Sequence, residues 1–311
     1  MRRHQKKIST GLRCAAIVSI GACVAVSMPS IALAQGTPTI ETVVTLPQAP
    51  NGQMENITEG PDDAIYVSAP FDKTVWKVKN GKAEKFYVPD NFEILSGIAG
   101  TKDELVVVVG GKSPFMARTD GQPGFVRNPM PPDAQPQAVL LDKSGKVKLT
   151  VPSSDPKPFF NGLARAGDDF YLATSGNAVF SIDLKAKKVE QWFADPMVRT
   201  NGIKVFNGWA YLTSGPNVFR VQIGPDHKPI GGAVMFAMGA QTDDFGVAPD
   251  GTLYIPSGKT IVKVTPAGQN SVFISDMGNE NSPAAWVTQD GKWLYWTERL
   301  GPAKVKRVAL K

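Results

Sequence analysis

Cysteine and histidine are nearly absent from this 311-residue chain. Both cysteines, Cys14 and Cys23, lie within the first 34 residues, and so does one of the two histidines. The rest of the chain therefore has no disulfide and no thiol chemistry, and its fold depends on its core alone. A Ser-His-Asp triad or a multi-histidine zinc site would have only His227, which lies in a turn composition, Gly-Pro-Asp-His-Lys-Pro, and which we interpret as a solvated loop residue.

Beyond its N-terminus, the chain also lacks a marked charge excess and a long apolar run. The first 34 residues hold five of the 34 basic residues and none of the 28 acidic ones, so the remainder is close to neutral. This balance gives no reason to expect nucleic acid or an anionic lipid surface as a partner. No later segment approaches about 18 unbroken apolar residues, which argues against a membrane span in the rest of the chain.

The first 34 residues have the composition of an export leader. They begin with the basic MRRHQKK, continue with small and apolar residues up to Met28, and end in Ala32-Leu33-Ala34, which fits a cleavage site. A membrane anchor is the competing interpretation, but Gly, Ser and Pro interrupt the apolar run. A lipoprotein site at Cys23 is a minor alternative. We predict a signal peptide at 1–34, cleavage near Ala34, and a periplasmic or secreted protein with a single domain at 35–311.

Tyrosine recurs along the chain with a regular spacing. The stretch 241–255, QTDDFGVAPDGTLYI, is typical of a strand, a tight turn and a second strand, and weaker versions of it recur. The anchor positions of the second strands are separated by 40, 65, 40, 43 and 41 residues: Tyr66, Val106, Tyr171, Tyr211, Tyr254 and Tyr295. A period near 40 built from short strands indicates propeller blades, so we predict an all-β, six-bladed β-propeller without helices.

The 65-residue gap and the C-terminal unit depart from this period. The gap places a long loop, dense in proline and glycine, at about 110–136 inside the second blade, where it would be either a lid or a decoration. The last unit has strands at 293–297 and 304–309 but no outer strand. We predict that Thr42–Leu46 completes this sixth blade and closes the ring. In the first blade we expect strands at 56–58, 64–68, 74–79 and 84–88.

Polar residues stand at the heads of the predicted inner strands. The heads lie about ten residues before the anchors: Glu55, Ser96, Asn161, Asn201, Asp243 and Ala284. Since the inner strands of a propeller line one channel, oxygen donors from four blades would meet at its mouth and suit a hard cation. A competing interpretation treats the Asn-Gly pairs at 161–162 and 201–202 as simple turns. A second set of carboxylates falls at the hairpin tips, where we expect solvated turn residues: Asp62, Asp63, Asp168, Asp169 and Asp250.

Four short motifs carry a family resemblance. Glu-Asn-Ile at 55–57, Asn-Gly-Leu at 161–163, Asn-Gly-Ile at 201–203 and Asp-Asp-Phe-x-x-x-x-Asp-Gly-x-Leu-Tyr at 243–254 resemble the SMP-30/gluconolactonase/LRE-like propellers, over the whole chain after the leader. The resemblance implies a divalent ion on the channel axis, held by Glu55, Asn201 and Asp243, with Asn161 contributing to the ion site and touching substrate. Ca²⁺ is favoured, with Mg²⁺, Mn²⁺ and Zn²⁺ as alternatives.

The chain departs from the family pattern at three points. Asp243-Asp244 replaces an Asp-Gly pair, so either carboxylate could face the ion, although the spacing to Gly251 favours Asp243. The loop at 110–136 has no counterpart in the family. The family's arginine for a substrate carboxylate has no clear match either.

The resemblance implies metal-assisted hydrolysis of a lactone or related ester. The ion would polarise the carbonyl and activate a water molecule, Asp243 would act as general base, and Asn161 and Asn201 would bind the small-molecule substrate. Two alternatives stay open, because a propeller fold alone licenses no particular function. One is a non-catalytic exported propeller that binds a small ligand or a partner protein, and the other is a metal-free enzyme similar to strictosidine synthase. No oligomeric state is predicted.

Overall fold

Short antiparallel strands joined by tight turns make up nearly all of the described chain. The structure is a computed structural model that describes residues 38–46, 54–70, 72–90, 94–110, 115–117, 125–127, 135–156, 158–239, 243–278, 282–298 and 302–310. The predicted leader at 1–34 lies outside these residues. Within the described segments the only helical element is one 3₁₀ turn, η1 (Pro61–Asp63), and no helix is long and apolar enough to cross a membrane.

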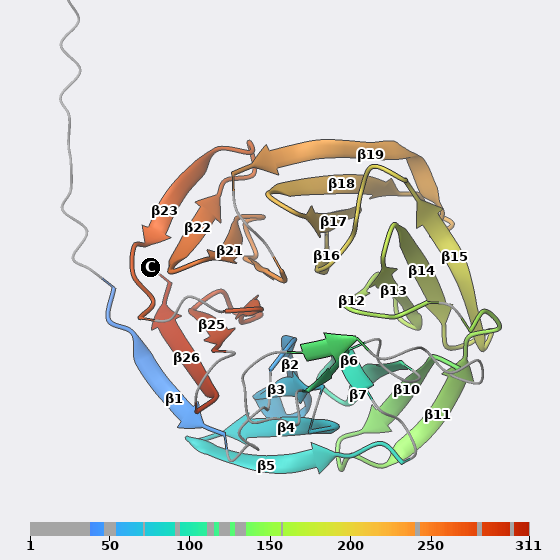
Figure 1. Ribbon diagram of the computed structural model, residues 1–311, viewed down its shortest axis with the longest axis horizontal. Helices are drawn as coiled ribbons and strands as arrows, with labels where there is room; N and C mark the ends of the chain where they lie inside the picture. The colour runs from blue at the N-terminus through green and yellow to red at the C-terminus, as the bar shows by residue number, and fades with distance from the viewer. Residues whose placement is uncertain are drawn as a thin grey trace, which may run out of the picture. The chain divides into compact units, whose positions relative to one another are not determined.

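The strands form six four-stranded antiparallel sheets, arranged radially as the blades of a β-propeller (Figure 1). Blades 1 and 2 consist, from the axis outwards, of β2 (Ile57–Gly60), β3 (Ala64–Ala69), β4 (Thr74–Lys79) and β5 (Lys82–Tyr87), and of β6 (Ile94–Gly100), β7 (Glu104–Gly110), β10 (Gln137–Asp142) and β11 (Val147–Pro152). Blades 3 and 4 consist of β12 (Leu163–Arg165), β13 (Phe170–Ser175), β14 (Ala178–Asp183) and β15 (Lys188–Ala194), and of β16 (Ile203–Phe206), β17 (Trp209–Ser214), β18 (Asn217–Ile223) and β19 (Pro229–Met238). Blades 5 and 6 consist of β20 (Gly246–Val247), β21 (Leu253–Ser257), β22 (Thr260–Val264) and β23 (Asn270–Ile274), and of β24 (Ala285–Val287), β25 (Trp293–Thr297), β26 (Lys304–Ala309) and β1 (Glu41–Thr45). The predicted fold is therefore confirmed.

The outermost strand of blade 6 comes from the other end of the described chain. β1 pairs antiparallel with β26, with Glu41 opposite Arg307 and Val44 opposite Val305. The Leu46 N–H extends this pairing by donating to the Ala303 carbonyl at 2.8 Å. The prediction that an N-terminal strand closes the sixth blade is confirmed, with the strand one residue earlier than expected.

The predicted periodicity also holds in detail. All six anchor residues lie on the second strands, and the two strands expected in the last unit have the predicted bounds. The first blade differs slightly, because its inner strand runs from Ile57 to Gly60, where Gly60 still pairs with Ala64, and its outer strand begins at Lys82. The five carboxylates expected at hairpin tips are all exposed.

The insertion in blade 2 lies between neighbouring strands of one sheet. β7 and β10 pair directly, so the chain leaves and re-enters between the second and third strands, as predicted. The exit point, Gly110, is paired with Ile94 at the start of β6, so it lies at the end of the blade where the inner strand begins. The insertion contains one more hairpin, in which β8 (Phe115–Ala117) pairs with β9 (Phe125–Arg127). Apart from this hairpin and residues 135–136, the insertion lies outside the described residues.

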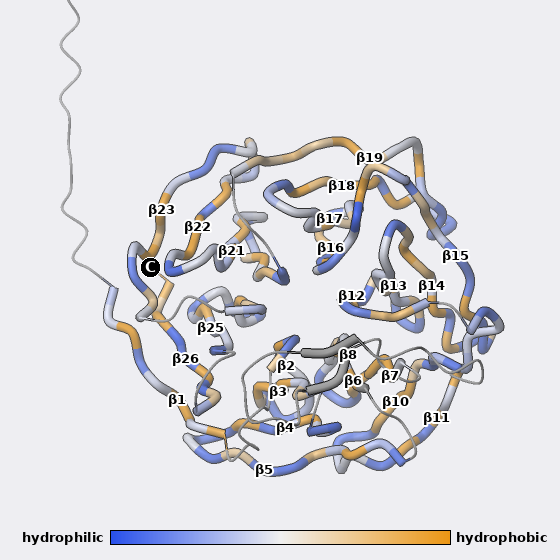
Figure 2. The backbone as a smooth tube through the Cα atoms, viewed as in Figure 1, coloured by the Kyte–Doolittle hydropathy of each residue, from blue (hydrophilic) through white to orange (hydrophobic). Residues whose placement is uncertain are grey.

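The hydrophobic core lies between the blades. The second strands are almost wholly buried, as in β3, where all six residues are buried, because neighbouring blades cover both faces. The outer strand β5 is mostly exposed or half-buried. Figure 2 shows hydrophobic segments along the middle of the blades, whereas the segments nearest the axis on several blades are hydrophilic. The axis is therefore the place where polar groups from different blades meet.

Candidate functional site

Oxygen-bearing side chains precede the inner strands of four blades, all at the same end of the ring. Glu55 lies just before β2, Asn161 before β12, Asn201 before β16 and Asp243 before β20, and each is half-buried. Because each of these residues precedes the inner strand of its blade, residues far apart in sequence come to the same end of the ring.

The other two predicted heads provide no oxygen ligand at the mouth. Ser96 lies inside β6, is buried, and donates its hydroxyl to the Phe160 carbonyl of the next blade. Ala284 is buried and apolar. The described part of the mouth is therefore polar on blades 1, 3, 4 and 5.

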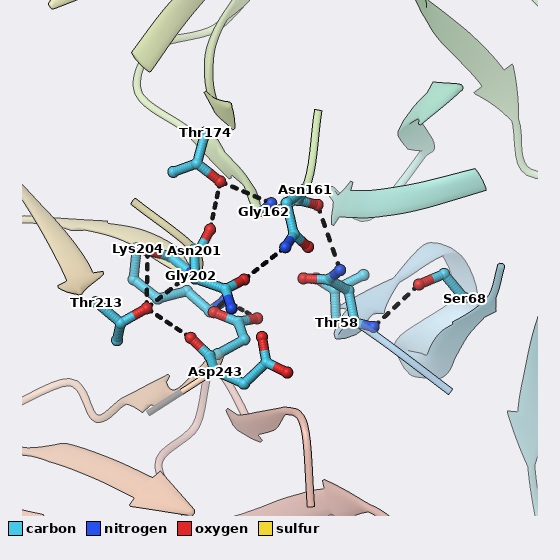
Figure 3. A network of polar contacts seen from close by, with 12 residues as sticks. Thr58, Ser68, Asn161, Gly162, Thr174, Asn201, Gly202, Lys204, Thr213 and Asp243 are labelled. Carbon is cyan, nitrogen blue, oxygen red and sulfur yellow. Dashed lines mark hydrogen bonds and ion pairs between the residues drawn. The ribbon is translucent and has the colours of Figure 1, made fainter. Parts of the chain in front are cut away.

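Hydrogen bonds connect these four blades (Figure 3). The Asn161 Nδ2 atom donates to Asn201 Oδ1 at 2.6 Å, and Asn56 Nδ2 in blade 1 donates to the Asn161 carbonyl at 3.4 Å. The Gly202 N–H in blade 4 donates to the Asp243 carbonyl in blade 5 at 3.1 Å. The mouth is therefore a connected polar network rather than a set of isolated side chains.

Two threonines on the second strands form hydrogen bonds to the backbone of this network. Thr174 accepts the Gly162 N–H at 2.8 Å and donates to the Asn201 carbonyl. Thr213 accepts the Gly202 N–H at 2.7 Å and donates to the Asp243 carbonyl at 2.5 Å. Each hydroxyl thus links its own inner strand to that of the next blade. Sequence reasoning missed both, although a hydroxyl residue two or three positions after the tyrosine anchor was a usable signal.

The Asn-Gly pairs are not turns. Neither asparagine nor glycine at 161–162 and 201–202 has a positive φ. A Cβ atom on Gly162 would lie 2.8 Å from the Asn201 carbonyl oxygen, and one on Gly202 would lie 2.6 Å from the Asp243 carbonyl oxygen. The turn interpretation is therefore wrong, since glycine stands here to allow neighbouring inner strands to approach closely.

Substitution of Gly202 by alanine is accordingly expected to destabilise the protein by about 2–3 kcal/mol, the upper part of the range for overpacked sites. The new methyl group would meet three atoms of Asp243 and Asp244 at 2.6–2.7 Å, two of which are backbone atoms. Urea unfolding measures this loss. Gly232→Ala is the control, because its Cβ would meet nothing within 4 Å and its φ is not positive. Equal stability of the two variants would contradict the packing argument.

The two adjacent aspartates have different surroundings. Asp244 is 2% exposed and paired with Lys204, whose Nζ atom lies 2.6 and 2.5 Å from its two carboxylate oxygens. Burial raises the pKa of the Asp244 carboxyl, and the Lys204 ammonium opposes that rise. Asp243 is half-buried, and Figure 3 shows its carboxylate directed toward the space between the inner strands. Of the two side chains, Asp243 is therefore the more exposed.

The donor set at the mouth suits a hard cation. Among the described residues, no three Asp, Glu, His or Cys side chains come together as a metal site, so an ion would need amide oxygens beside Glu55 and Asp243. Asn201 Oδ1 accepts one hydrogen bond and keeps a second lone pair. Carboxylate and amide oxygens without nitrogen or sulfur are typical ligands of Ca²⁺ and not of Zn²⁺. The residues present therefore fit such an ion.

His227 is remote from this network. It lies exposed in the turn between β18 and β19, as predicted, and its ring stacks on Phe170 at 4.6 Å. Phe170 is the first residue of β13, next to the hairpin tip of blade 3, so His227 lies at the opposite end of the blades from the strand heads. It therefore offers no imidazole to the mouth.

Comparison with known proteins identifies the fold. No protein-family model and no curated protein matches the sequence. The structure is similar to a gluconolactonase from Xanthomonas campestris (TM-score 0.58, 14% identity, 87% of this chain and 89% of that chain covered). It is also similar to the calcium-binding protein regucalcin from Agrobacterium tumefaciens (0.61, 14%, 88% and 96%) and to virginiamycin B lyase from Staphylococcus aureus (0.57, 11%, 88% and 99%). The predicted resemblance to gluconolactonase-type propellers thus holds for the fold, which proteins of different activities share.

Proposed function

We propose that the protein is a metal-dependent hydrolase of the gluconolactonase type that opens a lactone or a related ester. The observation that supports it is the convergence of Glu55, Asn161, Asn201 and Asp243, four oxygen-bearing side chains from separate blades, at one end of the ring. Fold similarity to a gluconolactonase and to a calcium-binding regucalcin supports the same class of function. The leader composition supports export to the periplasm or beyond.

In this proposal each of the four side chains has a defined role. Glu55, Asn201 and Asp243, together with Asn161, would hold a divalent cation, for which Ca²⁺ fits best. Such an ion supplies Lewis-acid polarisation of the ester carbonyl. Asp243 takes a proton from the attacking water while the oxygen of that water forms a bond to the carbonyl carbon. Asp243 then returns the proton to the leaving alkoxide when the ester C–O bond breaks. Asn161 and Asn201 orient the substrate through their amide groups.

A panel of lactones assayed with and without chelator tests this proposal. We expect hydrolysis of at least one lactone, loss of at least about 90% of that activity in EDTA, and recovery when Ca²⁺ is restored, because the cation polarises the reacting carbonyl. Isothermal titration with Ca²⁺ on the chelated protein should show one site. Activity that survives complete chelation would favour a metal-free enzyme instead. Absence of both hydrolysis and Ca²⁺ binding would favour a binding protein.

A further inference from the structure

A buried ion pair lies directly beside Asp243. Lys204, in β16 of blade 4, and Asp244, ahead of β20 in blade 5, are only 7% and 2% exposed. Lys204 Nζ donates to both carboxylate oxygens of Asp244, at 2.6 and 2.5 Å. The pair therefore joins two blades at the end of the ring where the inner strands begin.

The backbone around the two aspartates is held from both sides. The Asp243 carbonyl accepts hydrogen bonds from the Gly202 N–H and the Thr213 hydroxyl of blade 4. The Asp244 N–H donates to the Pro283 carbonyl, next to blade 6, at 2.7 Å. Together with the bonds from Lys204 to the Asp244 side chain, these contacts fix the stretch of backbone that carries the Asp243 side chain.

Stability alone gives little reason for a charged pair at this place. The free-energy cost of removing two charges from water often exceeds the gain from their mutual attraction. Apolar replacements of buried ion pairs are therefore often neutral or stabilising. Lys204 stands between Ile203 and Val205 in a strand that otherwise suits apolar residues. A role in placing a functional group accounts for the pair better than a role in packing.

We propose that Lys204 is a positioning residue: by binding Asp244 it directs the Asp243 carboxylate into the channel mouth and keeps Asp244 away from the cation and the attacking water. This inference rests on the proposed hydrolase function. It also explains how two adjacent carboxylates come to have different tasks.

A second ion pair with a buried carboxylate provides a control in the same chain. Lys306 of β26 forms an ion pair with Glu298, which is 3% exposed, and also donates to the Met277 carbonyl at 3.1 Å. This pair belongs to blade 6, with Lys306 in its third strand and Glu298 just after its second, whereas the four head residues precede the inner strands of blades 1, 3, 4 and 5. Loss of Lys306 should therefore affect stability in the same way as loss of Lys204, without affecting Asp243.

The experiment compares the wild type with Lys204→Met, Lys204→Arg, Lys204→Met/Asp244→Asn and Lys306→Met. Thermal unfolding, Ca²⁺ titration calorimetry, and kcat and KM on a lactone that the wild type hydrolyses are measured. We expect both single Lys→Met variants to unfold at lower temperature, because each removes the nearest cation of a buried carboxylate, although Lys304 stays 3.9 Å from Glu298 in Lys306→Met. The double variant, which removes that unpaired charge, should recover most of the lost stability.

Function should not recover with stability. In the double variant we expect kcat to stay at least about tenfold below the wild type, since small displacements of a reacting group have effects of this size, while KM changes less. The Ca²⁺ dissociation constant should rise at least about fivefold, because one ligand is misplaced. Lys204→Arg should restore part of kcat, and Lys306→Met should leave kcat and Ca²⁺ affinity within about twofold of the wild type.

Three results would overturn the inference. The first is an active wild type whose double variant keeps its kcat and its Ca²⁺ affinity, which would make the pair purely structural. The second is an equal loss of kcat in Lys306→Met, which would make the effect general. The third is a wild type that neither binds Ca²⁺ nor opens any lactone; this result is visible without any variant and removes the proposed function as well.

Discussion

Replacement of Asp243 by asparagine is expected to lower kcat for lactone hydrolysis by about 10²- to 10⁴-fold, the contribution of a positioned general base. Asparagine has nearly the same size and cannot accept the proton. The hydrogen bonds from Gly202 and Thr213 reach the backbone carbonyl of residue 243, which the substitution leaves in place. Loss of one of the two carboxylates at the mouth should also weaken Ca²⁺ binding. Steady-state kinetics and titration calorimetry measure the two effects separately.

Asp169→Asn is the appropriate control for this prediction. Asp169 is an exposed hairpin-tip carboxylate of blade 3, at the opposite end of the blade from Asn161. The substitution removes the same charge from the protein without touching the mouth, so both kcat and Ca²⁺ affinity should stay at wild-type values. If Asp243→Asn behaves like Asp169→Asn in both assays, Asp243 is neither base nor ligand.

The blade period could be predicted because every blade imposes the same packing on its second strand. The six anchors are at most 8% exposed, since they are covered by the neighbouring blades. In three blades the tyrosine also packs edge-to-face against a phenylalanine of the outer strand: Tyr66 with Phe86, Tyr211 with Phe236, and Tyr254 with Phe273. A repeated environment selects a repeated residue type, and that repetition is visible in the sequence.

The meaning of the Asn-Gly pairs could not be predicted in the same way. Glycine is required in a turn that needs a positive φ, and also in a strand that another backbone approaches closely. The same Asn-Gly sequence is therefore compatible with either structure. What decides between them at Gly202 is the Asp243 carbonyl, some forty residues further along the chain. Local pattern carries no information about that contact.

The partner of Asp244 was missed for a related reason. The strand heads occupy equivalent positions in the different blades, but Lys204 lies inside its strand and Asp244 lies one residue beyond a head. Their pairing depends on how far blade 5 is rotated against blade 4, which spacing does not give. A lysine between two apolar residues of an inner strand was nevertheless a signal, because lysine is seldom buried without a partner.

A chain that begins at residue 47 and so lacks β1 is expected to lose roughly 5 kcal/mol of stability or more, compared with one that begins at residue 38. Burial of a large apolar side chain such as Leu46 contributes about 1.5–3 kcal/mol, and each backbone hydrogen bond about 1 kcal/mol. Leu46 is 3% exposed and packs in one cluster with Met54 and Val305. The deletion also leaves β26 as an unpaired edge, so we expect aggregation in addition to earlier unfolding. Urea unfolding and light scattering measure both.

The ion pair of β1 serves as the control for its backbone pairing. Glu41 and Arg307 are joined at 2.8 Å, but both side chains are partly exposed, so Glu41→Gln should change stability by less than about 1 kcal/mol. A peptide of residues 38–46, added to the shortened chain, should bind the free edge of β26 and restore stability. The same peptide with proline at Val44, opposite Val305, lacks a backbone donor and should bind less well. If the shortened chain unfolds at the same urea concentration as the longer one, β1 does not close the ring in solution.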